Sequence, residues 1–173
     1  MILGIDNLQA MQFEPLRGKR VGLLSHDVAV SALRHTTAEI LHYSVNLVAM
    51  FGPEHGFRAT ALAGEKTETY EHPEWHIPVH SLYGKTREPT PEMLEGIDCM
   101  VCDLQDLGVR CYTYLATLRN MMRACARGGI PLLVLDRPVP LPSCVDGPIR
   151  EESLDSFVAP APVPFVYGMT LAE

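Results

Sequence analysis

The chain has 173 residues, of which 47% are apolar and 20% are charged, an ordinary composition for a soluble globular domain. This length allows one domain with a hydrophobic core and is short for two. The formal net charge is −7 and no cluster of Lys and Arg occurs, which argues against a nucleic-acid partner.

The predicted elements follow the chain in a regular alternation. Apolar runs predict strands, and 3.6-residue spacing or capping residues predict helices. We expect strands at 19–25, 45–51, 78–83, 97–104 and 131–136, and helices at 31–43, from Thr90 onward, and at 112–127 with a stop at Gly128-Gly129. After Asp136 the chain becomes rich in proline, so we expect it to be extended and irregular.

The main strands are short and apolar throughout, and helices separate them. Such strands belong to a parallel sheet that is covered on both faces. The expected fold is therefore an α/β fold, an open three-layer sandwich with a mostly parallel sheet.

No apolar run approaches the roughly 20 residues that a membrane-spanning helix needs. The segment 1–6 lacks the basic start and long apolar core of a secretory signal. Five cysteines, an odd number, do not suit a disulfide framework, so we expect reduced thiols and a cytoplasmic location. If further residues precede Met1, a secreted or periplasmic location stays open.

The sequence contains no convincing motif for binding a metal ion or a nucleotide. Cys99 and Cys102 form a C-x-x-C inside a predicted strand, where residues three apart point to opposite faces. Three histidines recur every four residues from His72 to His80, but prolines between them break any helix that would align them. The sequence contains no G-x-G-x-x-G, Walker A or G-x-S-x-G pattern. We therefore expect no metal and no cofactor.

Polar side chains follow each main strand. In an open parallel sheet the carboxyl ends of the strands lie along one edge, where ligands bind. Taken singly, each acidic residue after a strand could equally be a helix or turn cap. Four clusters together favour a site at this edge: 25–27, 54–55, 103–106 and 136–137, the last containing Asp136 and Arg137.

The loop from Phe51 to Arg58 is the most informative of these strand ends. Glu54, His55 and Arg58 follow a buried strand within a few residues, and glycines and a proline constrain the backbone around them. A functional loop is the favoured interpretation, and a salt-bridged structural turn is the alternative.

The segment 103–114 carries the densest polar chemistry. Its carboxylates, amide, guanidinium and phenols would suit a sugar, whose hydroxyls need donors and acceptors at fixed angles. The alternative is structural, with Arg110 pairing with Asp106, and Tyr112 packing on Tyr114. The candidate binding residues here are Gln105, Asp106, Arg110 and Tyr112.

The candidate site contains several carboxylates, and the sequence offers no obvious nucleophile or metal-binding motif to accompany them. Glycosidic bond cleavage requires a pair of carboxylates, and Glu54, Glu65 and Asp103 are the candidates. Walls formed by Phe51 and Phe57 would raise the pKa of Glu54 and make it the acid, provided that the rings face it.

Several blocks in order resemble the exo-β-N-acetylmuramidases of the NamZ type. They are Gly52-Pro53-Glu54-His55-Gly56-Phe57-Arg58, Ala63-Gly64-Glu65-Lys66, 81–86 with 89–94, 103–114, 136–138, 146–148 and Tyr167-Gly168-Met169-Thr170. The resemblance implies release of terminal N-acetylmuramic acid from peptidoglycan fragments, by a Rossmann-like domain that carries the cleft. It makes Glu54 the leading catalytic carboxylate and assigns His55, Arg58, Glu65, Asp103, Gln105, Arg110 and Tyr112 to the cleft.

The chain departs from the family pattern at several places. Where family members usually have Asn-Gln, this chain has His26-Asp27, and where they usually have Asn it has Val139. Asp146 takes the place of the usual Glu, and Val166 takes the place of a frequent Arg. The family also continues past residue 173. We therefore expect a Rossmann-like catalytic domain at 1–150, and a Pro-rich extended segment at 151–173 leading to a C-terminal domain that this sequence lacks.

Two other functions stay open. The departures and the short length are also consistent with a non-catalytic domain that binds a sugar or muropeptide. A metal- or nucleotide-dependent enzyme has only fold analogy behind it. The oligomeric state is unknown from the sequence.

Overall fold

A computed structural model describes residues 2–173, in which one six-stranded sheet has the order β3-β4-β2-β1-β5-β6. All neighbouring strands are parallel except β3 and β4. Since β1 lies in the middle, the chain moves outward through β2 and β4 and then returns to the other side of β1. The strands are β1 (Arg20–Ser25), β2 (Asn46–Gly52), β3 (Tyr70–Glu71), β4 (Pro78–Ser81), β5 (Cys99–Asp103) and β6 (Leu132–Val134).

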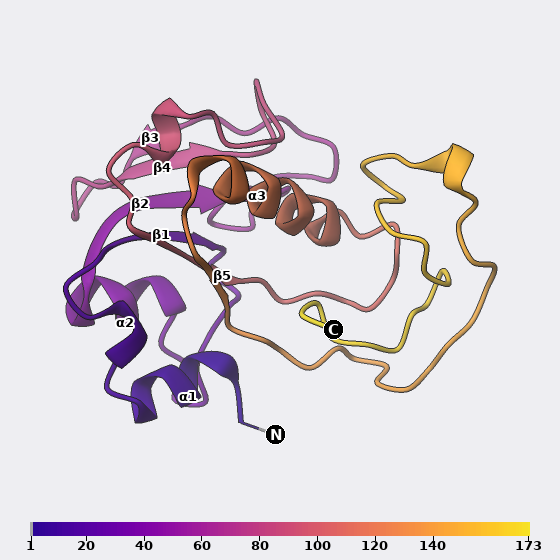
Figure 1. Ribbon diagram of the computed structural model, residues 1–173, viewed down its shortest axis with the longest axis horizontal. Coiled ribbons are helices and arrows are strands. Elements are labelled where there is room, and N and C mark those ends of the chain that lie inside the picture. The colour runs from indigo at the N-terminus through magenta and orange to yellow at the C-terminus, as the bar shows by residue number, and fades with distance from the viewer. Residues whose placement is uncertain (1) are drawn as a thin grey trace.

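Helices cover both faces of this sheet, as Figure 1 shows. α1 (Gly4–Ala10) and α2 (Thr37–Ser44) lie on one side, and the long α3 (Tyr114–Gly128) lies on the other. Three short 3₁₀ helices complete the order: η1 (Glu14–Leu16), η2 (Glu92–Leu94) and η3 (Glu152–Leu154). The predicted three-layer α/β sandwich is confirmed, whereas α1 was not predicted.

Alternating side chains of the strands build two separate hydrophobic cores. Leu23 and Val101 belong to the core beneath α1 and α2. Leu24 and Cys102, one position along the same strands, belong to the core beneath α3. This division follows from the strand geometry, in which successive side chains point to opposite faces.

The predicted helix at 31–43 is wrong at its start, because α2 begins only at Thr37. The side chain of Thr36 accepts from the backbone N–H of Glu39, and the Glu39 carboxylate accepts from the backbone N–H of Thr36. This capping box fixes the first turn. Leu33, an apolar residue inside the predicted range, lies in the preceding turn and is 79% exposed.

The helix predicted from Thr90 is also wrong, since the segment forms only the single turn η2, with Pro91 as its N-cap. Gly96, at a φ of 78°, ends the segment two residues later. The third predicted helix is confirmed as α3. It ends as expected, because Gly129 adopts the left-handed conformation at its C-cap.

From 138 to 173 the chain contains only η3 and isolated bridges, and it runs at the edge of the molecule (Figure 1). Val166 bridges to both Val109 and Asp146, and Arg110 donates to the carbonyls of Pro148 and Val163. The C-terminal segment is thus tied to the loop after β5. Among residues 2–173, no helix combines the length and the apolar character that crossing a bilayer requires.

Candidate active site

The polar strand ends meet at one edge of the sheet, as parallel pairing requires. The backbone N–H of Gln105, after β5, donates to Nε2 of His26, after β1, at 3.1 Å. Arg137, after β6, forms a salt bridge with Asp103 at the end of β5. The convergence predicted for these clusters is therefore present. The site residues divide into three groups: those around Glu54, those lining a pocket beside it, and those buried beneath.

Glu54 is held by donors from distant parts of the chain. It follows β2 and is 8% exposed. The Thr113 hydroxyl donates to Oε2 at 2.6 Å, and the Gly64 backbone N–H donates to Oε1 at 2.8 Å. The Tyr83 hydroxyl lies close to this carboxylate and also favours its ionised form. Polar donors around one carboxylate stabilise its ionised form.

The expected raised pKa of Glu54 is wrong. Burial acts to raise the pKa, but the hydrogen bonds from Thr113 and Gly64, together with the nearby Tyr83 hydroxyl, outweigh it, and the pKa of Glu54 is lowered. Phe51 and Phe57 do not enclose the carboxylate together, since they pack into the cores on opposite faces of the sheet. Glu54 is therefore ionised at neutral pH.

The turn after Glu54 fixes the orientation of His55. His55 and Gly56 both adopt positive φ, 70° and 74°, which is uncommon for a histidine. The His55 Nδ1–H donates to the Ala61 carbonyl at 2.9 Å, because a carbonyl can only accept. In the neutral ring, Nε2 is then left as an acceptor.

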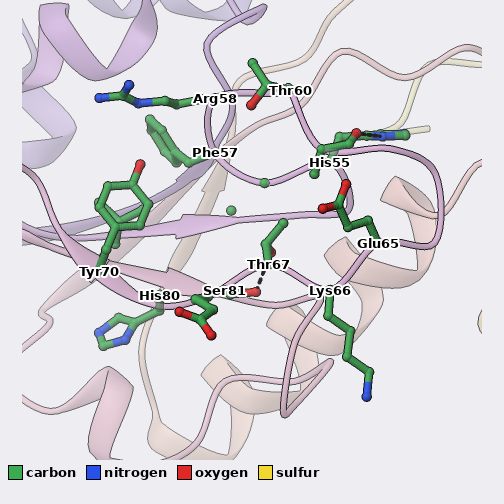
Figure 2. A pocket seen from close by; sticks show the side chains of 15 residues that line it. His55, Phe57, Arg58, Thr60, Glu65, Lys66, Thr67, Tyr70, His80 and Ser81 are labelled. Atoms are coloured by element: carbon green, nitrogen blue, oxygen red, sulfur yellow. Dashed lines mark hydrogen bonds between the residues drawn. The ribbon is translucent and has the colours of Figure 1, made fainter.

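A pocket of about 350 Å³ lies beside this turn. Figure 2 shows His55 and Glu65 at one end of it, and Tyr70 and His80 at the other. Arg58 also lines the pocket and is exposed. Glu65 is exposed as well, and one of its carboxylate oxygens accepts from the backbone N–H of Leu62 at 2.8 Å. His55, Arg58 and Glu65 can therefore reach a ligand in this pocket.

Asp103 has surroundings that suit a structural anchor. It is fully buried, and both its oxygens accept hydrogen bonds from Arg137, which is itself buried. The Thr37 hydroxyl at the start of α2 donates to the same carboxylate. Both side chains are turned toward each other and away from solvent, which favours an anchoring role over the catalytic role expected for Asp103 and the ligand contact expected for Arg137.

Asp106 is buried, and one of its oxygens accepts from the Tyr167 hydroxyl and from the Gly108 backbone. Burial raises the pKa of Asp106. Arg110 does not pair with Asp106 as the structural alternative supposed, since its guanidinium donates to Pro148 and Val163. Both residues thus fasten the C-terminal segment to the loop after β5.

Gln105 and Asp136 are also engaged within the chain. The Gln105 amide donates to the carbonyls of Asp106 and Pro138. The Asp136 backbone carbonyl accepts from Gly4, and its side chain accepts from the Ala172 backbone. These contacts join the N-terminal helix, the loop after β5 and the last residues of the chain.

Two tyrosines and a histidine pack beneath Glu54. The rings of Tyr112 and Tyr114 lie 4.4 Å apart, so this part of the structural alternative is confirmed. The Tyr114 hydroxyl donates to the Glu54 carbonyl at 3.5 Å, and its ring contacts His26 edge-on. Burial lowers the pKa of His26 to about 4, so this histidine is neutral at pH 7.

Thr113 and Tyr83 were not among the predicted site residues. Thr113 lies between the two tyrosines that the sequence singled out, and Tyr83 closes the expected strand before Gly84. The one signal in the sequence for Thr113 and Tyr83 as site residues is that each follows a parallel strand. Within residues 2–173, no group of three or more His, Cys, Asp or Glu side chains is arranged to hold a metal ion.

Comparison with known proteins places these residues in a family. Residues 21–173 match the family model described as exo-beta-N-acetylmuramidase NamZ, N-terminal. The chain belongs to the NamZ N-terminal family. Its fold also matches two crystal structures of DUF1343 family proteins from Bacteroides fragilis NCTC 9343. They share 42% and 33% sequence identity, with TM-scores of 0.89 and 0.81, and the chain covers 43% and 44% of them.

A curated relative in this family is the peptidoglycan beta-N-acetylmuramidase NamZ of Bacillus subtilis (strain 168). It is 43% identical over an alignment that covers 98% of this chain. The chain spans only 42% of the length of that relative. Each solved structure is likewise matched over less than half of its length.

Proposed function

We propose that this chain is the part of a glycosidase that carries a catalytic carboxylate, Glu54, and that it acts on peptidoglycan-derived sugars ending in N-acetylmuramic acid. The proposal rests on one observation above all. Glu54 is a nearly buried carboxylate fixed by Thr113 and Gly64 at the carboxyl edge of a parallel sheet, and the next residue, His55, lines an open pocket. The curated relative, named as a peptidoglycan β-N-acetylmuramidase, supports the substrate class.

The ionised state of Glu54 suits a role other than general acid. A carboxylate that accepts several hydrogen bonds can stabilise positive charge at the anomeric carbon, attack it, or take a proton from water. In each case the glycosidic C–O bond breaks, and water supplies the hydroxyl and the proton of the products. Glu54 therefore acts as the base or nucleophile of the pair.

Glu65 is the proposed second carboxylate. It follows Gly64, whose N–H donates to Glu54, and it lines the pocket together with His55. An exposed carboxyl in this position can reach the oxygen of the leaving group. The configuration of the released sugar tests the pairing, since retention needs carboxyl groups about 5 Å apart and inversion needs roughly 6.5–9.5 Å.

The decisive experiment measures release of N-acetylmuramic acid from a β-glycoside of that sugar. Loss of a catalytic carboxylate typically lowers the rate by 10²-fold or more. We expect losses of this size for Glu54→Gln and Glu65→Gln, and a wild-type rate for Glu95→Gln, a change at an exposed glutamate that lines no part of the pocket. Wild-type turnover by Glu54→Gln would remove it from the mechanism.

The same experiment addresses the alternative of a non-catalytic binding domain. Calorimetric binding of N-acetylmuramic acid without any turnover by the wild-type chain would favour that alternative. We also propose that the catalytic unit corresponds to residues 1–150 and that 151–173 form an extended segment that packs against it and leads toward a second domain. Truncation at residue 150 that preserves a cooperative unfolding transition would support this boundary.

A further inference from the structure

Arg87 is an exposed arginine beside the candidate active site, and two aromatic rings hold it in place. Its guanidinium carbon lies 4.9 Å from the centroid of the Tyr83 ring and 4.4 Å from that of Phe157. The two rings are themselves 6.0 Å apart. Contact with aromatic faces restricts a flexible side chain while leaving its N–H groups free to donate.

The guanidinium of Arg87 lacks a partner of its own. It makes no hydrogen bond and no ion pair with any residue from 2 to 173. The neighbouring carboxylate, Glu88, is already paired with Arg127 of α3. The backbone of Arg87 is nevertheless fixed, since its carbonyl accepts from the Asn120 side chain at 2.8 Å. Arg87 is thus an ordered cation with unused donors.

The location of Arg87 connects it to Glu54. Tyr83 links the two, because its ring lies beneath the guanidinium and its hydroxyl is close enough to the Glu54 carboxylate for each group to affect the pKa of the other. Arg87 and Glu54 therefore lie on either side of one tyrosine.

Phe157 belongs to the C-terminal segment, which is joined to α3 near this position. Asp155 forms an ion pair with Arg119 of α3 at 2.8 Å, and Arg119 also donates to the Pro160 carbonyl at 2.7 Å. These contacts place Phe157 against Arg87 from a part of the chain about 70 residues away. The segment after β6 therefore forms part of the surroundings of this cation.

We propose that Arg87 binds a carboxylate of the substrate and determines specificity for an acidic sugar, the lactyl carboxylate of N-acetylmuramic acid being the group it takes. This inference rests on the proposed function of the Glu54 site and names the substrate group that the site selects. Arginine presents planar paired donors that match a carboxylate, and such a pair is stronger than a neutral hydrogen bond. N-acetylglucosamine has the same ring without this acid.

The test is binding measured by calorimetry, which does not depend on turnover. Four probes separate the possible sources of the carboxylate: N-acetylmuramic acid, its methylamide, N-acetylglucosamine and the dipeptide L-alanyl-D-glutamate. We expect the free acid to bind roughly 10- to 100-fold more tightly than the methylamide or N-acetylglucosamine, and the dipeptide to bind no better than these.

Arg87→Gln should abolish the preference for the acid while N-acetylglucosamine binds as it does to the wild type. Arg87→Lys should retain part of the preference, since it keeps the charge without the planar fork. Arg123→Gln, a change at an exposed arginine of α3, is the matched control and should preserve it fully. Thermal unfolding of each variant checks that the fold is intact.

Four outcomes would count against the inference. Equal binding of the acid and N-acetylglucosamine by the wild type, or an unchanged preference in Arg87→Gln, overturns the role of Arg87 and leaves the proposed sugar function standing. Tighter binding of the dipeptide than of the sugar acid shows that the site selects a peptide carboxylate instead. Binding of neither sugar overturns the proposed function and the inference together.

Discussion

The hydroxyl of Thr113 donates a 2.6 Å hydrogen bond to Oε2 of Glu54, although 59 positions separate the two residues in the chain. Thr113 immediately precedes α3, and Glu54 follows β2. The contact therefore joins the helix on one face of the sheet to the loop at its carboxyl edge. It also contributes to the lowered pKa of Glu54, against the effect of burial.

Thr113→Val is expected to raise the pKa of Glu54, because it removes a donor to the ionised carboxylate and keeps the shape of the side chain. If ionised Glu54 is required, activity will fall at a higher pH in the variant as the pH is lowered. Thr113→Ser keeps the hydroxyl and should behave as the wild type. Carbon NMR of labelled glutamate gives the pKa directly, and an unchanged value in Thr113→Val would contradict the prediction.

The Asp103–Arg137 pair should matter for folding stability. Removing one partner of a buried ion pair leaves an uncompensated charge and typically costs about 3–5 kcal/mol. We expect Arg137→Met to lower the free energy of unfolding by this amount in urea titrations. Glu65→Gln, at an exposed position, should change it by less than about 0.5 kcal/mol. A fully stable Arg137→Met would show that the pair is dispensable.

Stability should fall as the pH drops from 6.5 toward 4, in part because of His26. Burial lowers the pKa of this histidine to about 4 in the folded chain, so only the unfolded chain binds the proton within that window. The linked loss is on the order of 3 kcal/mol.

His26→Gln should therefore show a shallower loss of stability between pH 7 and pH 4 than the wild type. His35→Gln, at an exposed histidine, should leave the slope unchanged. Urea unfolding at several pH values provides the comparison. Parallel slopes for wild type and His26→Gln would exclude His26 as the origin of the effect.

Gly52→Ala should displace the loop that carries Glu54. A Cβ at this position would lie 2.6 Å from the Phe57 backbone nitrogen, closer than side chains approach backbone atoms. We expect a loss of about 1–3 kcal/mol in stability, together with lower activity. Gly128→Ala is a suitable control, since its Cβ would meet only the flexible end of Ile130 at 3.3 Å. Equal melting temperatures for both variants would argue against close packing at Gly52.

The sequence determined the alternation of buried strands and helices, because apolar runs and helical spacing are local properties of the chain. It also indicated that polar groups after β1, β2, β5 and β6 would meet, since parallel strands share one carboxyl edge. The start of α2 is set by its capping residues, which the prediction from apolar spacing did not take into account. The pattern Thr36-Thr37-Ala38-Glu39 contained the signal for the start of α2, whereas the apolar Leu33 was misleading.

Only the tertiary structure decided what each polar residue does. Asp103 and Glu54 both follow apolar strands and look equivalent in the sequence, yet Asp103 is buried against Arg137 and Glu54 accepts from Thr113 beside a pocket. The guanidinium of Arg87 is positioned by contact with Phe157, which belongs to the C-terminal segment. The charge state and accessibility of such groups depend on partners that are distant in the chain, and no local pattern encodes them.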